Sequence, residues 1–216
     1  MTKDYTRAYW ETALAESRPD GRMFIDGERT SAATGLTFTR IRPMDGKPAA
    51  DIARAGINDV NLAVASARRA FESGIWRKME PAAKKKILLA WADLIRKHAE
   101  ELALLETIDV GKPVMASLNV DVTLAANCIQ YYAEMCDKLY DEIAPTGPND
   151  RALVRKVPLG VIGAITPWNY PMIIETWKLG PALAAGNSVV LKPAEQSSLS
   201  ALKLADLASQ AGLPSG

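Results

Sequence analysis

Apolar residues recur at helical spacing in three stretches of the first half of the chain. They cover residues 60–71, 81–105 and 118–139, and in each the apolar positions fall three or four apart. Asn58 or Asp59 offers a cap for the first of these helices, because both residue types accept backbone hydrogen bonds well. The pattern predicts three amphipathic helices that bury their apolar faces against a common neighbour.

Shorter elements are predicted ahead of these helices. Residues 6–17 favour a short helix, and residues 37–42 alternate between apolar and polar side chains as a strand does. Between them, Asp26 and Gly27 separate two short extended runs. Glycine tolerates a positive φ, so this pair predicts a β-hairpin turn.

The second half of the chain has continuous apolar runs instead of helical spacing. Residues 160–166 and 188–192 are solidly apolar runs that predict two buried strands, separated by a helix that opens at Pro171. A final helix is predicted over residues 199–210. This order predicts a parallel β-α-β unit covered by helices, and therefore an α/β fold.

Composition and charge exclude several classes of function. The 216 residues are 48% hydrophobic and 24% charged, and 26 Lys and Arg balance 25 Asp and Glu for a net charge of +1. Such a balance gives the chain no excess of basic residues to attract nucleic acid or an anionic membrane. No apolar run is long enough to span a bilayer, and the first ten residues have no apolar signal region. We expect a cytoplasmic protein with no nucleic-acid or membrane partner.

The cysteines and the single histidine restrict the chemistry further. Cys128 and Cys136 fall on one predicted helix, with about 12 Å of rise between them, too far apart for a disulfide. We expect both to be core thiols. His98 alone cannot make a His-rich metal site, and we expect it at the core margin with a hydrogen-bonding partner.

Two predicted strand ends are the best candidates for a ligand site. Ligands of open α/β sheets bind beyond the carboxyl ends of the strands, which here are residues 166–169 and 192–195. Each is followed by a helix N-terminus that could face a pyrophosphate, while Lys192 and Glu195 could bind ribose hydroxyls. However, the G-x-G-x-x-G phosphate fingerprint is missing. The plainer interpretation, that the prolines only stiffen these loops and the charges are solvated, therefore stays open.

The motifs at these positions resemble the aldehyde dehydrogenase superfamily. They read P-W-N-Y-P at residues 167–171, W-K-L-G-P-A-L-A-A-G-N at 177–187 and K-P-A-E-Q at 192–196. Earlier segments agree: F-I-D-G at 24–27, R-R-A-F at 68–71 and L-E-T-I-D-V-G-K-P at 105–113. The arrangement is most similar to the branch that acts on aminoaldehydes, including γ-glutamyl-aminobutyraldehyde and betaine aldehyde.

The resemblance implies oxidation of an aldehyde to its acid with NAD(P)⁺, through a cysteine thiohemiacetal that a glutamate helps to hydrolyse. Asn169 matches the family's oxyanion-stabilising asparagine, although its amide could instead cap the following helix. The family's nucleophilic cysteine, its glutamate and its glycine-rich turn are expected beyond Gly216. We therefore expect the 216-residue chain alone to be inactive. The alternative is a non-catalytic fragment that binds a nucleotide or a partner.

The resemblance also assigns further binding residues. The cofactor contacts are Ile165, Thr166, Pro167, Trp168, Asn169, Lys192, Ala194 and Glu195. A carboxylate at Glu195 should repel the 2′-phosphate of NADP, so NAD is expected, with NADP not excluded. The substrate tunnel is assigned to Tyr170, Ile173, Ile174 and Trp177, although Trp177 could equally be helix-to-sheet core. Carbonyl oxygens at Ile41, Asp109 and Gln196 match a monovalent-cation site found in some members.

The resemblance finally implies a domain organisation. Residues 1–140 would form an N-terminal hairpin and helices that pack on the cofactor domain, and residues 141–158 resemble the family's oligomerisation segment. Residues 159–216 would be the first half of a Rossmann-like NAD-binding domain, with the catalytic domain absent. The expected fold is thus an incomplete aldehyde dehydrogenase fold: an N-terminal helical segment plus the first β-α-β units of a parallel sheet. The parent enzyme is expected to be a homodimer or homotetramer acting on a small aldehyde.

Overall fold

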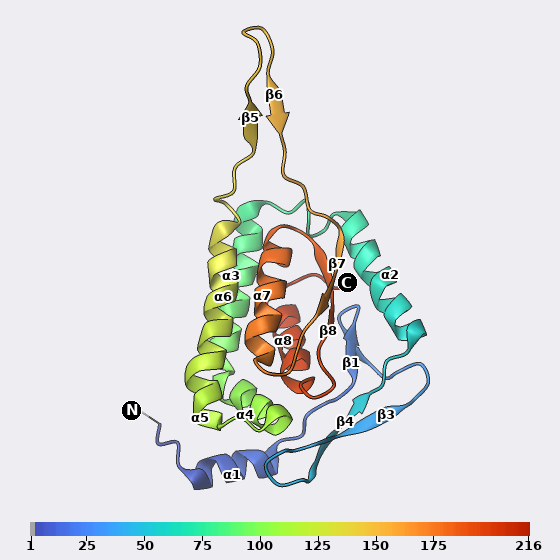
Figure 1. Cartoon of the computed structure of the whole chain (residues 1–216), viewed down its shortest axis with the longest axis vertical. Helices are drawn as coiled ribbons and strands as arrows, with labels where there is room; N and C mark the ends of the chain where they lie inside the picture. The colour runs from blue at the N-terminus through green and yellow to red at the C-terminus, as the bar shows by residue number, and fades with distance from the viewer. Residues whose placement is uncertain (1–2) are drawn as a thin grey trace.

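A computed structural model describes residues 3–216; residues 1 and 2 of the predicted N-terminal segment lie outside it. Figure 1 shows a body of packed helices with small sheets beside it and one projecting hairpin. In chain order the elements are α1 (Arg7–Glu16), β1 (Met23–Ile25), β2 (Glu28–Thr30), β3 (Thr37–Ile41), β4 (Pro48–Ala53), α2 (Ile57–Ser73), α3 (Pro81–Lys97), α4 (Ala99–Val110), α5 (Val114–Ala116), the π-helix η1 (Ser117–Asp121), α6 (Val122–Met135), β5 (Glu142–Ala144), β6 (Ala152–Val154), β7 (Val161–Ile165), α7 (Pro171–Ala184), β8 (Ser188–Lys192) and α8 (Leu199–Gln210).

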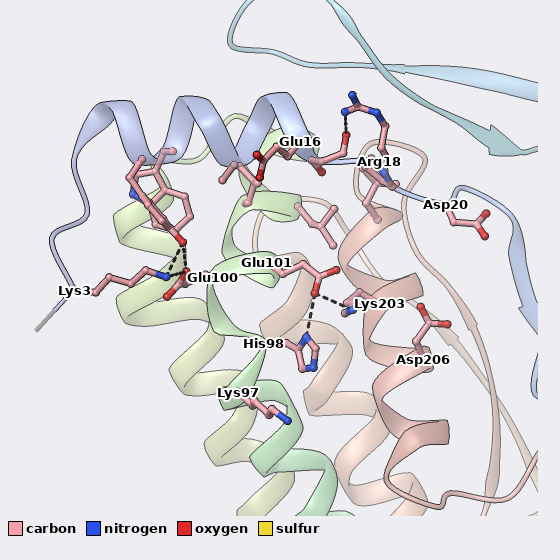
Figure 2. A pocket seen from close by; sticks show the side chains of 18 of the residues that line it. Lys3, Glu16, Arg18, Asp20, Lys97, His98, Glu100, Glu101, Lys203 and Asp206 are labelled. Atoms are coloured by element: carbon pink, nitrogen blue, oxygen red, sulfur yellow. Dashed lines mark hydrogen bonds and ion pairs between the residues drawn. The ribbon is translucent and has the colours of Figure 1, made fainter. Parts of the chain in front are cut away.

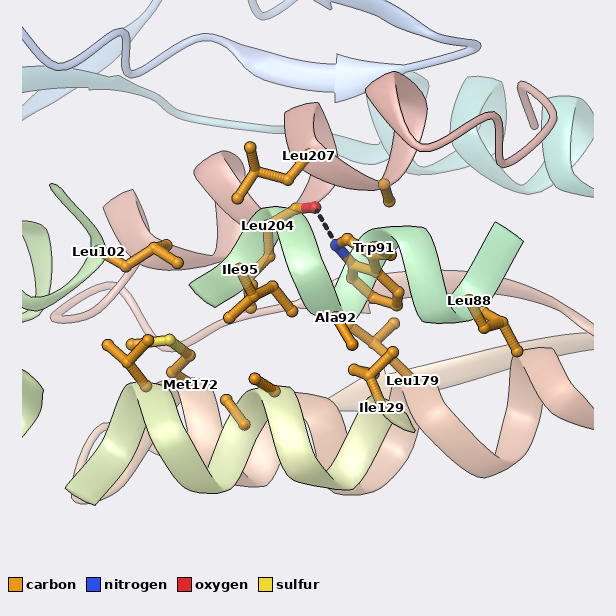
Figure 3. Packing of buried hydrophobic residues seen from close by; sticks show 14 of the residues in the cluster. Leu88, Trp91, Ala92, Ile95, Leu102, Ile129, Met172, Leu179, Leu204 and Leu207 are labelled. Carbon is orange, nitrogen blue, oxygen red and sulfur yellow. Dashed lines mark hydrogen bonds between the residues drawn. The ribbon is translucent and has the colours of Figure 1, made fainter. Parts of the chain in front are cut away.

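The main core lies between α3, α6, α7 and α8. Trp91 of α3 lies at the centre of this core and is 2% exposed. Its indole N–H donates to the Leu204 carbonyl of α8 at 3.1 Å (Figure 3). The other buried indole, Trp76, donates to the carbonyl of Leu183 in α7 at 2.9 Å. Each indole therefore buries a large apolar surface without leaving its N–H unpaired. No helix among residues 3–216 is long and apolar enough to cross a membrane.

The N-terminal elements largely follow the sequence prediction. β1 and β2 pair antiparallel around Asp26 and Gly27, whose φ angles of 55° and 81° are those of a tight hairpin turn. β3 and β4 form a second antiparallel pair. The predicted helix over residues 6–17 is α1, whose N-cap Thr6 accepts a hydrogen bond from the Tyr9 N–H.

Two local predictions in the helical segment are wrong. The N-cap residue of α2 is Gly56, not Asn58 or Asp59, although the Asp59 side chain completes a capping box from the first turn. Asp59 accepts hydrogen bonds from the backbone N–H groups of Gly56 and Ala33, both at 2.8 Å. The single helix predicted over residues 118–139 is interrupted as well, because it starts with the π-helix η1 before α6.

The segment predicted to support oligomerisation forms a separate hairpin. β5 and β6 pair antiparallel and project away from the helical body, as Figure 1 shows. Ile143 and Leu153, which pair across this hairpin, are 68% and 69% exposed. The hairpin thus carries apolar side chains that nothing in the described chain covers.

The parallel sheet matches the predicted fold class only in part. β7 and β8 pair in parallel and α7 connects them, which confirms the β-α-β unit. The described residues contain no third parallel strand, so an extended Rossmann-like sheet is not present. The prediction that both strands are buried is also wrong for β7, where Ile165 is 78% exposed. Both α2 and α7 contact the two strands, but the end of β7 stays accessible.

Candidate functional site

The two predicted strand ends lie side by side. Ile165 at the end of β7 is paired in register with Lys192 at the end of β8. One residue on, the Thr166 N–H donates to the Lys192 carbonyl at 3.2 Å. The loops that follow the two strands therefore start from the same sheet edge, as the β-α-β topology requires.

The first loop exposes most of the side chains that the resemblance selected. Trp168 is 55% exposed, and Pro167 and Asn169 are exposed as well, whereas Thr166 is buried at 3%. The N-cap of α7 is Tyr170, and no side-chain hydrogen bond caps this helix. The alternative role of Asn169, capping the helix with its amide, is therefore wrong. The amide is left accessible to a ligand at the strand end.

The second loop carries an exposed ion pair. Lys192 Nζ lies 2.7 Å from Glu195 Oε1, and the two side chains are 56% and 64% exposed. The hydrogen bond from Lys192 lowers the pKa of Glu195, so this carboxyl is ionised at neutral pH. Ala194, between them, accepts a backbone hydrogen bond from Ser197 at 3.0 Å, which closes the turn into α8.

One expected anion site is already filled. The first amide of α8, the Leu199 N–H, donates to Asp109 Oδ2 at 2.7 Å. A fully buried carboxylate from α4 thus occupies the helix N-terminus that we expected to face a pyrophosphate. The sequence could not show this, because 90 residues separate the two partners.

The predicted substrate-lining residues divide into accessible and buried positions. Tyr170 is 49% exposed and Trp177 59%, whereas Ile173 is buried at 5% and Ile174 is half-buried. Trp177 therefore does not pack between helix and sheet, and its alternative role as core is wrong. The Lys112 ammonium lies 4.4 Å from the centre of the Tyr170 ring and forms an ion pair with the buried Asp121. This cation–π contact holds the Tyr170 ring in place.

Helices α6 and α7 pack side by side. The thiols of Cys128 and Cys136 approach the carbonyls of Thr176 and Ala184, 48 residues further on in both cases. Two apolar residues that the sequence reasoning did not select, Val120 of η1 and Leu124 of α6, are each 47% exposed. Their only signal in the sequence is that they are apolar residues off the buried stripe.

Neither cysteine is built as a nucleophile. Both are half-buried within or at the end of α6, and burial raises the pKa of each thiol. Their S–H groups donate to backbone carbonyls instead of facing a base. A thiol in these surroundings is largely protonated at neutral pH, so it is a poor attacking group. The single histidine, His98, has the partner predicted for it, since Nδ1 lies 3.1 Å from Glu101 Oε2.

The three residues assigned to a cation differ in their surroundings. Ile41 is 42% exposed and Gln196 is exposed, whereas Asp109 is fully buried. The Asp109 carbonyl oxygen already accepts a hydrogen bond from the Arg40 guanidinium. Residues 3–216 also contain no cluster of three His, Cys, Asp or Glu side chains arranged for a metal ion.

Two cavities with different linings border α8. A mostly apolar cavity of about 720 Å³ borders β8, and Lys192, Pro193 and Glu195 are among its lining residues. A charged cavity of about 770 Å³ lies between α1, α4 and α8, where Glu101 bridges His98 and Lys203 (Figure 2). Only the first cavity is continuous with the strand ends, so it is the one that can extend a site there.

Curated relatives resemble the chain along nearly its whole length. The NADP/NAD-dependent aldehyde dehydrogenase PuuC of Escherichia coli (strain K12) is 50% identical over 209 residues, which are 97% of this chain and 42% of that protein. The aminoacetaldehyde dehydrogenase of Pseudomonas aeruginosa is 45% identical over 216 residues, 100% of this chain and 44% of that protein. The chain thus spans less than half the length of these relatives.

Solved structures share the fold. An indole-3-acetaldehyde dehydrogenase in complex with NAD⁺ superimposes with a TM-score of 0.97 at 48% identity, covering 98% of this chain and 43% of that one. The γ-glutamyl-γ-aminobutyraldehyde dehydrogenase of Burkholderia cenocepacia gives 0.95 at 48% identity, covering 96% and 42%. The sequence model described as "Aldehyde dehydrogenase family" matches residues 30–216. The chain therefore belongs to the aldehyde dehydrogenase family and corresponds to its N-terminal portion.

Proposed function

We propose that this chain supplies the cofactor-binding edge and the oxyanion-stabilising amide of an NAD-dependent aldehyde dehydrogenase that oxidises an aldehyde to its carboxylic acid. The observation that supports this most is the meeting of the two strand ends, with Ile165 in register with Lys192. The names of two relatives, which act on aminoacetaldehyde and on γ-glutamyl-γ-aminobutyraldehyde, favour aminoaldehydes as the substrate class.

The cofactor contacts follow from the chemistry of the exposed edge. Lys192 can donate to the ribose hydroxyls of a dinucleotide, and the Glu195 carboxylate can accept from them. The exposed residues Ile165 and 167–169, which flank the buried Thr166, form the other side of the same edge, with Ala194 in the turn between the charges. Because both charges are solvated and paired only with each other, a ligand can engage them without disrupting the core. When bound there, the nicotinamide would supply the hydride acceptor.

The selectivity for NAD would come from Glu195. Its pKa is lowered by Lys192, so it carries a full negative charge at neutral pH. A 2′-phosphate placed beside this carboxylate would be repelled, whereas a 2′-hydroxyl could donate to it. Lys192 partly offsets this repulsion, which is consistent with a relative whose name includes both cofactors.

Asn169 would stabilise the negative oxygen that develops on the attacked aldehyde carbon. Its amide is exposed, is not used to cap α7, and stands on a short loop fixed between β7 and Pro171. Removing one such preorganised donor costs about 2.7–4 kcal/mol of transition-state stabilisation. Tyr170, Ile174 and Trp177 follow it on α7 and would form an apolar wall for the substrate.

The nucleophile and the base would come from elsewhere. Both thiols of this chain are half-buried and hydrogen-bonded to carbonyls, so neither can attack the substrate. We therefore expect the purified 216-residue chain to bind NAD without turning over any aldehyde. Turnover by this chain that is lost in Asn169→Ala would contradict that assignment.

Calorimetric titration of the purified chain with NAD and NADP tests the cofactor site. We expect weak binding with a preference for NAD, a loss of affinity in Lys192→Met, and a reduced preference over NADP in Glu195→Gln. Lys203→Met is the matched control, because Lys203 pairs with Glu101 in the separate charged cavity. No binding at millimolar NAD, or an equal loss in the control, would overturn the proposal. Binding without involvement of Lys192 and Glu195 would favour a different, non-catalytic nucleotide site.

We also propose the domain roles implied by the resemblance. Residues 159–216 would belong to the NAD-binding domain, the preceding helices would pack on it, and the β5–β6 hairpin would join subunits. The hairpin is favoured because Ile143, Leu153 and Val157 are exposed by 68%, 69% and 74% on a projecting ribbon. Replacing Ile143 and Leu153 by serine should lower the oligomeric state seen by light scattering. Identical masses before and after the substitution would contradict this role.

A further inference from the structure

Arg40 makes two contacts with a single residue of α4. Its guanidinium Nη2 donates to the backbone carbonyl of Asp109, and its Nε lies 3.5 Å from the carboxylate oxygen Oδ1 of the same residue. The Arg40 side chain is only 14% exposed, and that of Asp109 is fully buried. A positive charge is therefore fixed between β3 and the last turn of α4.

The Asp109 carbonyl needs such a partner. In a helix, this oxygen would accept a hydrogen bond from the N–H four residues on, but that residue is Pro113, which has no N–H. The end of a helix also carries partial negative charge, which favours a cation. The location is thus one where a bound cation or a cationic side chain would stabilise the fold.

Two other acidic side chains are buried near this contact. Glu106 and Glu175 are fully buried, and burial favours the neutral form of both carboxyls. Neither oxygen of Glu175 has a hydrogen-bond partner in the described chain. The second Asp109 oxygen is used by the Leu199 N–H of α8. Arg40 is thus the cationic side chain in contact with the point where β3, α4 and α8 meet.

We propose that the Arg40 guanidinium takes the place of the monovalent cation that the family resemblance assigns to Ile41, Asp109 and Gln196. The junction of β3, α4 and α8 is then held without a metal ion. This follows from the donor set, because the one fully buried oxygen donor of the three is already used by Arg40. It predicts that this protein is indifferent to Na⁺ and K⁺ at this site.

The first test uses the unaltered 216-residue chain. Thermal unfolding is followed by circular dichroism in KCl, NaCl and choline chloride at equal concentrations, so that charge screening is the same in all three. We expect the same unfolding midpoint in each salt. A higher midpoint in K⁺ or Na⁺ than in choline would overturn the proposal, because it would show that an inorganic cation still stabilises the native chain.

The second test removes the built-in cation. Arg40→Met should lower the midpoint in choline chloride, and K⁺ or Na⁺ should raise it again with the logarithm of its concentration, as expected for an ion that binds only the folded state. Arg42→Met is the matched control: Arg42 lies just past the same strand and pairs with Asp45, so its loss should be equal in all salts. A loss in Arg40→Met that no cation restores, or no loss at all, would overturn the proposal.

Two further measurements test the proposal even if Arg40→Met folds poorly in solution. Arg40→Lys keeps one positive charge but loses the second donor, so it should fold with a lowered midpoint that stays indifferent to K⁺. Crystals of Arg40→Met soaked in rubidium should show an anomalous peak beside the Asp109 carbonyl. The same peak in the unaltered chain would overturn the proposal.

Discussion

Two sets of acidic side chains differ sharply in how the fold treats them. Glu195, at the end of β8, is 64% exposed and paired with Lys192 at 2.7 Å. Glu106, Asp109 and Glu175 are fully buried among α4, α7 and α8, and several of their oxygens have no hydrogen-bond partner in the described chain. Glu195 is available to a ligand, whereas the three buried carboxyl groups act inside the fold.

The pKa shifts of the two sets run in opposite directions. The hydrogen bond from Lys192 lowers the pKa of Glu195, whereas burial raises the pKa of Glu106 to about 7 and that of Asp109 to about 7. Burial also raises the pKa of Glu175 well above its ordinary value, helped by the negative charges of Glu106 and Asp109. Carboxyl groups of one chemical type therefore differ in charge at neutral pH because of their surroundings alone.

This difference shows where function can be altered at little cost in stability. An exposed ion pair contributes little to folding, so its residues can be chosen for ligand chemistry. A buried carboxylate must be neutral or compensated, and Asp109 is compensated by Arg40 and the first amide of α8. Substitutions in the two sets should consequently separate effects on binding from effects on stability.

The largest effect is expected for Asp109→Ala. It would leave the buried Arg40 guanidinium without its carboxylate and the N-terminus of α8 without its acceptor. Breaking a buried pair from one side costs about 3–5 kcal/mol of unfolding free energy, which urea denaturation measures. Asp45→Ala, which removes the partner of Arg42 near the surface, is the control and should change the midpoint far less. Equal losses of unfolding free energy in the two variants would show that the burial of Asp109 does not set the cost of removing it.

A smaller effect of opposite sign is expected for Glu175→Met. Its folded pKa is raised, so its contribution to stability is present below the unfolded value of about 4.3 and is lost as pH rises through the folded value. Replacing Glu175 by Met removes the cost of keeping this buried carboxyl protonated, which grows by about 1.4 kcal/mol for each pH unit between the unfolded and the folded pKa. The gain should appear at pH 8 and shrink towards pH 5 in urea denaturation. A gain that does not depend on pH would contradict this origin.

The smallest effect on stability is expected for Glu195→Gln. The folded pKa is lowered, so any contribution is present above the unfolded value and is lost as pH falls through the folded one. Because the side chain is 64% exposed, we expect a change within about 0.5 kcal/mol at pH 7. The same variant should alter the relative affinity for NAD and NADP. A large loss of stability without a change in cofactor affinity would show that Glu195 acts in folding and not in cofactor binding.

Local sequence signals account for most of the helices and strands and for the positions of the candidate site. The apolar runs, Pro171 and the Gly186–Asn187 stop predicted β7, α7, β8 and α8 within a residue or two at most ends. The hairpin turn at Asp26 and Gly27 was also predicted from its residues. Such features depend on neighbours in the chain, through periodicity, fixed φ angles and turn chemistry, so they leave a local signal. Parallel pairing then brought residues 166–169 and 192–195 to one edge.

Which polar groups are already paired within the fold depends on long-range packing. Asp109 caps a helix 90 residues away, Arg40 meets the same residue from 69 residues before it, and Asp59 bonds to Ala33 as well as to Gly56 at the start of α2. None of the long-range partners is visible in a local pattern, because each depends on how distant elements pack. The exposure of Ile165 has the same origin: an apolar run predicts a strand, but whether a face is buried depends on what covers it.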